Sequence, residues 1–334
     1  ETRAMENSTA RARGLVTPMA PVFIGGCGRS GTTMLGALLG NHPDAVCIPE
    51  SIFKADAMAL LARDGRASDD ALRAVLTRSA TGNFFDFSAL PSTGGAAPPE
   101  RLRRIYHWFA EENVPAGASP RYVVDHTPHN LEQSSRLRAL FPDARFIHII
   151  RDGRAVAASM RKVTWGSNTA LAVAHDWVKG IGIGLAAQEA LGPLATRVRY
   201  EDLLEEPEAT LRRLCQFLGW EFHQEMLAGG SYRPAEAYRE QHSLVGRPVE
   251  KSRGAAWQRE LPAREIEAFE SYAGPLLECL GYELTHAVPR YPRRHERAIM
   301  WAEELGLVLA NKVRLGRIRR RSRKGVARAG RGEA

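Results

Sequence analysis

The chain has 334 residues, of which 44% are hydrophobic and 25% charged, so it is long and apolar enough to bury a sizeable core. Its four cysteines show no CxxC or CxH spacing, which speaks against a zinc site and against a disulfide framework. The formal net charge of +8 belongs to a C-terminal tail, so a nucleic-acid-binding surface on the rest of the chain is not indicated.

An apolar run near the start of the chain ends in a glycine-rich loop, and residues 22–33 read VFIGGCGRSGTT. A buried strand, this loop and a following helix predict a site for a phosphate-like anion. Glycines let successive N–H groups turn inward, and the helix adds the positive end of its dipole. The residues expected to hold the anion are Arg29, Ser30, Gly31, Thr32 and Thr33.

The spacing of Gly26 and Gly31 also fits the first half of an ATP-binding P-loop, but such a loop would have lysine where this chain has Thr32. The P-loop lysine reaches the outer phosphates, and its neighbour holds Mg²⁺. Arg29 is the only cation in this loop, which suits a transferable group of lower charge than a γ-phosphate. A small-molecule kinase is the alternative enzyme, and a non-catalytic nucleotide- or anion-binding protein is the alternative from another class.

A second strand-to-helix block, residues 145–160, reads RFIHIIRDGRAVAASM. Its apolar strand stops at Arg151, and Ser159 follows two helical turns later. Both side chains can face the crevice at the carboxyl edge of a parallel sheet, where α/β folds bind nucleotides. The alternative is an ordinary charged turn in which Arg154 is solvated.

The two blocks together resemble the nucleotide site of sulfotransferases that use 3′-phosphoadenosine 5′-phosphosulfate (PAPS). The segment GGCGRSGTT resembles their 5′-phosphosulfate loop, and Arg151 with Ser159 resembles their 3′-phosphate clamp. The resemblance covers most of residues 21–284 and is closest to tyrosylprotein-type and related bacterial enzymes. It implies an α/β fold with a P-loop-type parallel sheet flanked by helices.

The activity that this resemblance implies is transfer of a sulfuryl group from PAPS to a hydroxyl acceptor, with release of 3′,5′-adenosine bisphosphate (PAP). The acceptor stays open among a peptide tyrosine, a carbohydrate, a lipid and a secondary metabolite. Arg29 would stabilise charge on the leaving phosphate oxygen. No metal ion is required by this scheme.

Glu50 follows the short strand predicted at residues 45–48, so it emerges on the same sheet edge as the glycine-rich loop. Sulfuryl transfer needs the acceptor proton removed as the S–O bond forms, and a positioned carboxylate can do this. The resemblance implies this role, because tyrosylprotein sulfotransferases have a glutamate after this strand. The alternative is that Glu50 or Ser51 only begins the helix IFKADAMALLA.

His126 lies in the segment VVDHTPHN, residues 123–130, which reads as a short strand and its exit. Many members of the resembled family have a lysine at this position, beside the bridging oxygen of the donor. With histidine there, three roles stay open: general base, protonated stabiliser of the leaving group, and hydrogen-bonded structural residue. We prefer Glu50 to His126 as the base.

Two later segments complete the nucleotide site that the resemblance implies. A strand predicted to end at residues 200–202 brings Tyr200 toward the nucleotide, unless that ring is only a partly buried core residue. The segment SLVGRPVEKSRGAAW, residues 243–257, resembles a late basic loop that closes over the 3′-phosphate. Its candidate contacts are Lys251, Ser252 and Arg253, and a solvated basic loop is the alternative.

We expect three regions: a disordered segment at residues 1–20, a single sulfotransferase domain with helical insertions at 21–288, and a C-terminal helix with a basic tail at 289–334. From residue 311 onward the chain has ten Lys or Arg and one Glu. This charge allows contact with acidic lipid, nucleic acid or an acidic acceptor, and the helix before it could lie on an anionic membrane or dock on the domain. The alternative is a solubilising arm with no fixed partner. No apolar segment approaches the ~20 residues that span a bilayer, and the cysteines favour a reducing compartment, so the expected location is the cytoplasm.

Overall fold

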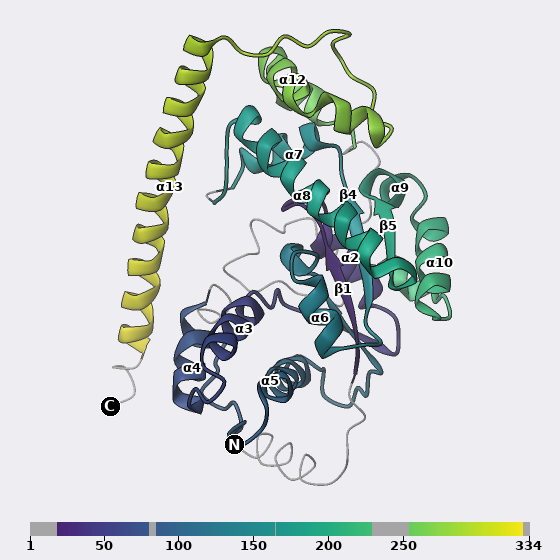
Figure 1. Cartoon of the computed structure of the whole chain (residues 1–334), viewed down its shortest axis with the longest axis vertical. Coiled ribbons are helices and arrows are strands. Elements are labelled where there is room, and N and C mark those ends of the chain that lie inside the picture. The colour runs from purple at the N-terminus through teal and green to yellow at the C-terminus, as the bar shows by residue number, and fades with distance from the viewer. Residues whose placement is uncertain (1–18, 80–84, 164, 229–253, 330–334) are drawn as a thin grey trace.

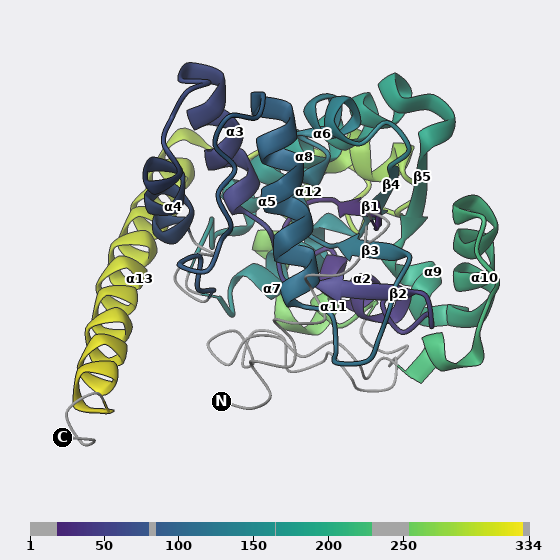
Figure 2. The ribbon, with the colours of Figure 1, turned by 90° about the horizontal axis from the view of Figure 1, so that it is seen from below.

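A five-stranded parallel sheet forms the centre of the protein, with helices on both of its faces (Figures 1 and 2). The computed structural model describes residues 19–79, 85–163, 165–228 and 254–329. The strands are β1 (Ala20–Gly25), β2 (Ala45–Ile48), β3 (Tyr122–Asp125), β4 (Arg145–Ile150) and β5 (Ala195–Arg199). Their order in the sheet is β2-β3-β1-β4-β5, and each neighbouring pair is parallel.

Helices follow most strands and cover the sheet. The α-helices are α2 (Thr32–Leu39), α3 (Phe53–Arg63), α4 (Asp69–Arg78), α5 (Pro98–Glu112), α6 (Ser134–Leu140), α7 (Gly153–Met160), α8 (Ala170–Leu191), α9 (Tyr200–Glu205), α10 (Pro207–Leu218), α11 (Trp257–Glu260), α12 (Ala263–Cys279) and α13 (Arg294–Ala329). Short 3₁₀ turns are η2 (Pro128–Asn130), η3 (Gly192–Leu194) and η4 (Gln224–Ala228). The helical insertion between β2 and β3 consists of α3, α4 and α5.

The alternation of side chains along the central strands divides the core between the two faces of the sheet. Phe23 and Phe146 are buried in a cluster with residues of α3, α5 and α6. Ile24 and Ile147 belong to the opposite cluster, with residues of α2, α9 and α10. A third cluster surrounds Trp177 and joins α7, α8 and α12. Because β1 and β4 are buried on both faces, their sequences are nearly continuous apolar runs.

The predicted α/β class, with a parallel sheet flanked by helices, is confirmed. The strand predicted at residues 45–48 has those bounds, and the strand predicted to stop at Arg151 ends at Ile150. Parallel strands end at one edge of the sheet, so the loops after β1, β2, β3 and β4 lie at the same edge. This edge carries the candidate site.

The chain after β5 differs from the sequence prediction. The strand ends at Arg199, and residues 200–205 form the short helix α9 instead of continuing the strand. Glu201 and Asp202 lie in the first turn of α9, where the helix dipole favours carboxylates. This turn leaves the ring of Tyr200 buried at the carboxyl edge of the sheet.

Helix α13 extends along one side of the protein, on the side of α3 and α4 (Figures 1 and 2). Its Glu304 carboxylate is buried and accepts hydrogen bonds from the N–H groups of Asn168 and Thr169 at the start of α8. Among the described helices, α13 included, we find none that is long and apolar enough to cross a membrane.

Candidate active site

The glycine-rich loop between β1 and α2 has the backbone of an anion site. Gly31 precedes α2 with a φ of 99°, and Arg29 has a φ of 68°. Among the described residues, Arg29 is the only non-glycine residue in the left-handed region, a strained conformation that clusters at functional sites. No side chain caps α2, so the N–H groups of its first turn face a site where an anion can bind.

Close packing requires glycine at two positions of this loop. A Cβ on Gly26 would overlap the carbonyl oxygen of Ile149 in β4, and a Cβ on Gly31 would overlap the ring of Tyr200. The loop is therefore held directly against β4 and against the start of α9. The same packing places Tyr200 in contact with the loop.

Side chains from the two predicted phosphate blocks meet beside this loop. Arg29 Nε donates to Ser159 Oγ over 3.1 Å, and a terminal nitrogen of Arg151 donates to the Arg29 carbonyl oxygen over 3.0 Å. The Arg151 guanidinium lies 4.4 Å from the centroid of the Tyr200 ring, a cation–π distance. Burial and the Arg151 charge lower the pKa of Arg29. Two close guanidinium groups disfavour each other, and a bound anion would remove this repulsion.

Two buried polar atoms here have no hydrogen-bond partner among the described residues, Ser30 Oγ and Arg151 Nε. Buried polar groups in proteins are nearly always paired. Unpaired donors beside two arginines therefore fit a phosphate or sulfate group, to which such donors bind strongly. Thr32 and Thr33, both buried, add hydroxyls at the first turn of α2.

Glu50 lies between β2 and α3, at the sheet edge that carries the glycine-rich loop. It does not cap α3, because the N-cap of this helix is Ile52 and no side chain bonds its first turn. Burial and then the Asp125 charge raise the pKa of Glu50 to about 7, against the lowering effect of Arg29 and Lys54. A carboxyl group with a pKa near neutrality is suited to proton transfer.

A buried polar cluster holds the backbone next to Glu50. The Asp125 carboxylate accepts hydrogen bonds from Lys54 Nζ, Ser51 Oγ and Thr127 Oγ1. The Ser51 N–H donates to Thr127 Oγ1 over 2.8 Å, so Ser51 is fixed to the end of β3 and does not cap α3. Burial opposes ionisation of Asp125, yet Lys54 and the two hydroxyls lower its pKa to about 2.

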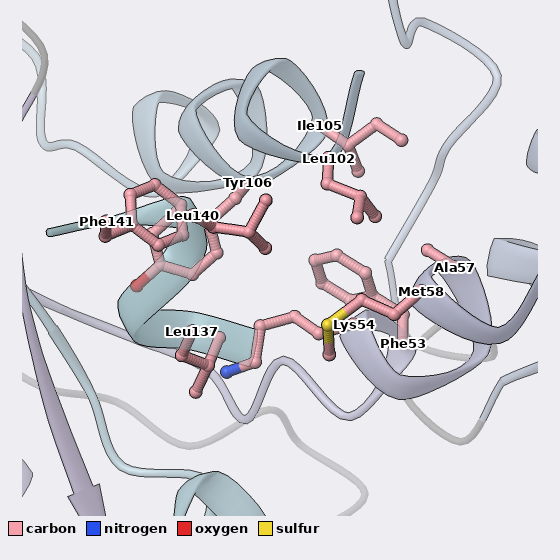
Figure 3. A pocket seen from close by; sticks show the side chains of 10 residues that line it. All are labelled: Phe53, Lys54, Ala57, Met58, Leu102, Ile105, Tyr106, Leu137, Leu140 and Phe141. Carbon is pink, nitrogen blue, oxygen red and sulfur yellow. The ribbon is translucent and has the colours of Figure 1, made fainter. Parts of the chain in front are cut away.

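A narrow pocket between α3, α5 and α6 lies beside this cluster (Figure 3). Apart from Lys54 its lining is almost entirely apolar, and its volume of about 10 Å³ leaves room for no more than one water molecule. Lys54 Nζ lies 5.1 Å from the ring centroid of Phe23 and 5.7 Å from that of Tyr106. The pocket is therefore a gap in the core around a buried ammonium group, too small for an acceptor.

His126 is buried against α2. A Cβ on Gly36 would overlap the Cβ of His126 and contact its ring. This contact holds the His126 ring between α2 and the end of β3.

The remaining predicted contacts of the nucleotide, Lys251, Ser252 and Arg253, lie outside the described residues. Within the part of the chain that the structure describes, no group of three or more His, Cys, Asp or Glu side chains could hold a metal ion.

Arg154, for which the sequence also allowed a solvated position, is buried. Its guanidinium pairs with Asp152 over 2.8 Å and with Glu270 over 2.6 Å, and it lies 4.0 Å from the ring centroid of Trp257. The charged turn after β4 is thus anchored to α11 and α12. Arg154 and Glu270 are 116 residues apart in the chain, so no local pattern reveals their contact.

Trp165 is a further candidate that the sequence analysis missed. Its ring lies 3.5 Å from the position of a Cβ on Gly28, and 40% of the residue is exposed. An indole in contact with the phosphate loop is a candidate for contact with a substrate, because aromatic rings contribute a large apolar area to binding sites. The only sequence signal is its place shortly after the second phosphate block.

Comparison with known proteins identifies the family. A model of the sulfotransferase family matches residues 21–224, more than half of the chain. The chain therefore belongs to the sulfotransferase family, and it is a PAPS-dependent sulfotransferase.

Several relatives match over most of the chain. Protein-tyrosine sulfotransferase A of Caenorhabditis elegans is 27% identical over 295 residues, which are 85% of this chain and 73% of that protein. Protein-tyrosine sulfotransferase 1 of Mus musculus is 30% identical over 288 residues, covering 82% of this chain and 72% of that protein. Nodulation protein NoeE of Sinorhizobium fredii is 28% identical over 302 residues, covering 81% of this chain and 69% of that protein.

The fold is also that of a solved structure. The sulfotransferase domain from the curacin biosynthetic pathway superposes with a TM-score of 0.56 and 19% sequence identity, over 81% of this chain and all of that domain. This likeness supports the α/β sulfotransferase fold.

Proposed function

We propose that this sulfotransferase uses Glu50 as the general base that deprotonates a hydroxyl acceptor. The observation that carries the proposal is the position of Glu50, a carboxyl group with a pKa of about 7 that interacts electrostatically with Arg29 of the glycine-rich loop. A base with a pKa near the working pH is partly ionised and can still accept a proton effectively. The family resemblance at this position supports the same role.

The donor would be held by the two phosphate blocks. The 5′-phosphosulfate contacts are Arg29, Ser30, Gly31, Thr32 and Thr33, and the 3′-phosphate contacts are Arg151 and Ser159. The unpaired Ser30 Oγ and Arg151 Nε support this assignment, since each could donate to a phosphate oxygen. The Tyr200 ring would hold the Arg151 guanidinium in place through their cation–π contact. Lys251, Ser252 and Arg253 stay candidate contacts from the sequence alone.

The reaction is an in-line transfer at sulfur. The acceptor oxygen forms the new S–O bond as its proton passes to Glu50, and the S–O bond to the bridging phosphate oxygen breaks, which releases PAP. Arg29 and the N–H groups of the loop would stabilise the negative charge that develops on the phosphate. The chain's contribution is therefore positioning, charge stabilisation and removal of one proton.

A peptide tyrosine is the acceptor that we propose first. Relatives named protein-tyrosine sulfotransferases match more than four fifths of this chain at 26% to 30% identity. The half-exposed ring of Trp165 beside the loop supports an aromatic acceptor as well. Carbohydrate, lipid and secondary-metabolite hydroxyls are the other classes to be screened.

We further propose a cytoplasmic location with peripheral membrane contact through the basic C-terminal segment. Cys279 is an exposed thiol, a group that a reducing compartment preserves. The net charge of +9 from residue 311 onward supports attraction to anionic lipid.

The first test combines binding with turnover. Calorimetric titration with PAP, and with ATP and Mg²⁺ in parallel, is expected to give tight binding of PAP alone. With radiolabelled PAPS and a panel of tyrosine peptides and sugar, lipid and phenolic acceptors, Glu50→Gln is expected to reduce kcat by at least ~100-fold while PAP binding stays unchanged.

Glu189→Gln is the matched control, because Glu189 is an exposed carboxylate on α8, away from the loop. It should keep both PAP affinity and turnover. Normal kcat in Glu50→Gln would remove Glu50 from the role of base. Turnover of sugars but not of tyrosine peptides would overturn the proposed acceptor and leave the reaction class intact.

A further inference from the structure

Helix α13 exposes a row of large apolar side chains. Trp301 is 59% exposed, Leu305 is 61% exposed and Leu309 is 53% exposed. Residues four apart lie on the same face of an α-helix, so the three side chains form one stripe, which we call the 301–309 stripe. A contiguous exposed apolar surface on a soluble domain commonly marks a binding site.

The adjacent face of α13 is fixed to the protein. Glu304 accepts hydrogen bonds from the Asn168 N–H over 3.0 Å, the Thr169 N–H over 2.7 Å and the Thr169 hydroxyl over 2.9 Å. Near the start of the helix, Glu296 pairs with Arg264 over 3.0 Å and with Arg290 over 2.9 Å. These contacts orient the helix, so the stripe faces outward.

Beyond the stripe, the same helix enters the most basic part of the chain. Helix α13 continues to Ala329, and residues 311–334 have ten Lys or Arg and one Glu. Apolar side chains next to concentrated positive charge are the combination by which an interfacial helix binds an anionic bilayer. A second copy of the chain docked in parallel on the stripe would bring two strongly positive segments together, which Coulomb repulsion disfavours.

We propose that α13 is an interfacial helix that binds an anionic lipid bilayer by inserting the 301–309 stripe. The positive charge that follows in the sequence would strengthen the attraction to anionic headgroups. This deepens the membrane contact proposed above by assigning it a surface. The helix does not cross the bilayer. It lies in the plane of the interface and attaches the sulfotransferase domain to the membrane.

The attachment point is close in the chain to the candidate active site. Glu304 holds Asn168 and Thr169, and Trp165, a few residues earlier, lies against Gly28 of the phosphate loop. A bilayer bound to α13 would therefore hold the donor loop near the membrane surface. Acceptors displayed at that surface would meet the site at raised local concentration.

The test is co-sedimentation of the full chain with vesicles. We expect binding to mixed phosphatidylglycerol–phosphatidylcholine vesicles and much weaker binding to pure phosphatidylcholine. The variant with Trp301→Ser, Leu305→Ser and Leu309→Ser should bind the anionic vesicles at least ~10-fold more weakly, because three apolar side chains no longer enter the bilayer. Tryptophan emission should shift to shorter wavelength when vesicles are added to the unaltered chain, and the shift should be lost in the stripe variant, which lacks Trp301.

The matched control replaces Ile299 and Leu307 with serine. Both are exposed apolar residues of α13 but lie on a different face from the stripe, so vesicle binding should be preserved. Equal binding by the stripe variant and the unaltered chain would overturn the proposal. So would a dimer, seen by sedimentation equilibrium, that the stripe variant abolishes, since the stripe would then bind a second copy.

This test is independent of catalysis. Sulfuryl transfer to a soluble acceptor, measured without vesicles, should be equal in the stripe variant and the unaltered chain. Vesicle binding without any transfer activity would reject the proposed reaction chemistry and support the membrane-binding role of α13. Transfer activity without vesicle binding would support the reaction chemistry and reject the membrane-binding role.

Discussion

Lys54 and Glu50 are electrostatically connected through a shared neighbour. Lys54 Nζ pairs with the fully buried Asp125, and the Asp125 charge raises the pKa of Glu50 while the Lys54 charge lowers it. Burial lowers the pKa of Lys54, and the Asp125 charge and hydrogen bond oppose that effect. Lys54 is thus a positioning residue that acts on the proposed base through Asp125 and Ser51.

Replacing Lys54 with methionine should change the pH dependence of the reaction. The Asp125 charge would then be uncompensated, which raises the pKa of Glu50 further and moves the acid limb of the kcat–pH profile to higher pH. The free energy of unfolding should also fall by about 3 kcal/mol, since removing one partner leaves a buried charge unpaired. Initial rates across pH and urea unfolding measure the two effects.

The double variant Lys54→Met with Asp125→Asn provides the control for this residue pair. It removes both buried charges, so its acid limb should return to the wild-type position or below it, and part of the stability should be recovered. An acid limb that is the same in Lys54→Met and in the wild type would show that Lys54 has only a structural role.

At the scale of elements, α13 supplies the cap of another helix. The N-cap residue of α8 is Thr169, whose own side chain makes no capping hydrogen bond to the helix. The Glu304 carboxylate accepts from its N–H and from that of Asn168 instead. A carboxylate at the start of a helix both pairs free N–H groups and interacts with the helix dipole. The two helices therefore stabilise each other.

Glu304→Ala should lower the free energy of unfolding by about 1 to 2 kcal/mol, the usual loss for an N-cap. It should also release α13 from α8, so trypsin should cleave the basic part of α13 faster than in the wild type. The neighbouring exposed Glu303 gives the control Glu303→Ala, which should change neither property. Equal stability and equal cleavage of both variants would show that the cap contributes nothing measurable.

The elements that the sequence predicted correctly are those defined by local patterns. Strands at residues 45–48 and 145–150 and the helix after Gly31 follow from apolar runs, glycines and turn residues that are adjacent in the chain. The prediction was wrong at residues 200–202, where a helical turn begins at once. A short segment after a strand fits either state, and the packing of Tyr200 on Gly31 favours the helix.

Contacts between distant segments could not be predicted. Arg154 with Glu270 and Lys54 with Asp125 are separated by 116 and 71 residues in the chain. A single sequence contains no signal for such pairs, because a charged residue that is buried and paired cannot be told in the sequence from one that is solvated. For the candidate site, the sequence supplied Arg29, Ser159 and Arg151 but could not show that they touch.

On the scale of the whole molecule, buried histidines make the fold sensitive to acid. Burial lowers the pKa of His42, His107 and His148. His148 has the largest shift, and its pKa falls to about 4. Burial is the main cause, while a hydrogen bond to Gln188 raises the pKa slightly and the Arg197 charge lowers it. His148 belongs to β4, and its ring packs on α8, where a Cβ on Gly184 would overlap it. Protonation therefore places a charge inside the interface between the sheet and α8.

The sign of the effect follows from the two pKa values of His148. In the unfolded chain the pKa is about 6.5, and in the folded protein it is about 4, so the unfolded state binds more protons between these values. The contribution of His148 to stability is complete above about pH 6.5 and is lost as the pH falls through 4. Between about pH 7 and pH 4.5 this loss amounts to about 2 to 3 kcal/mol.

Urea unfolding of the wild type and of His148→Gln at a series of pH values tests this. Glutamine cannot gain a proton, so the stability of the variant should fall less with acidification. From pH 7 to pH 4.5, the free energy of unfolding of the wild type should fall by about 2 to 3 kcal/mol more than that of His148→Gln. His42 and His107 remain in both proteins, so their contribution cancels in the difference. A difference that stays constant with pH would mean that His148 is protonated in the folded protein as readily as in the unfolded chain, and that the interface between β4 and α8 accepts the charge.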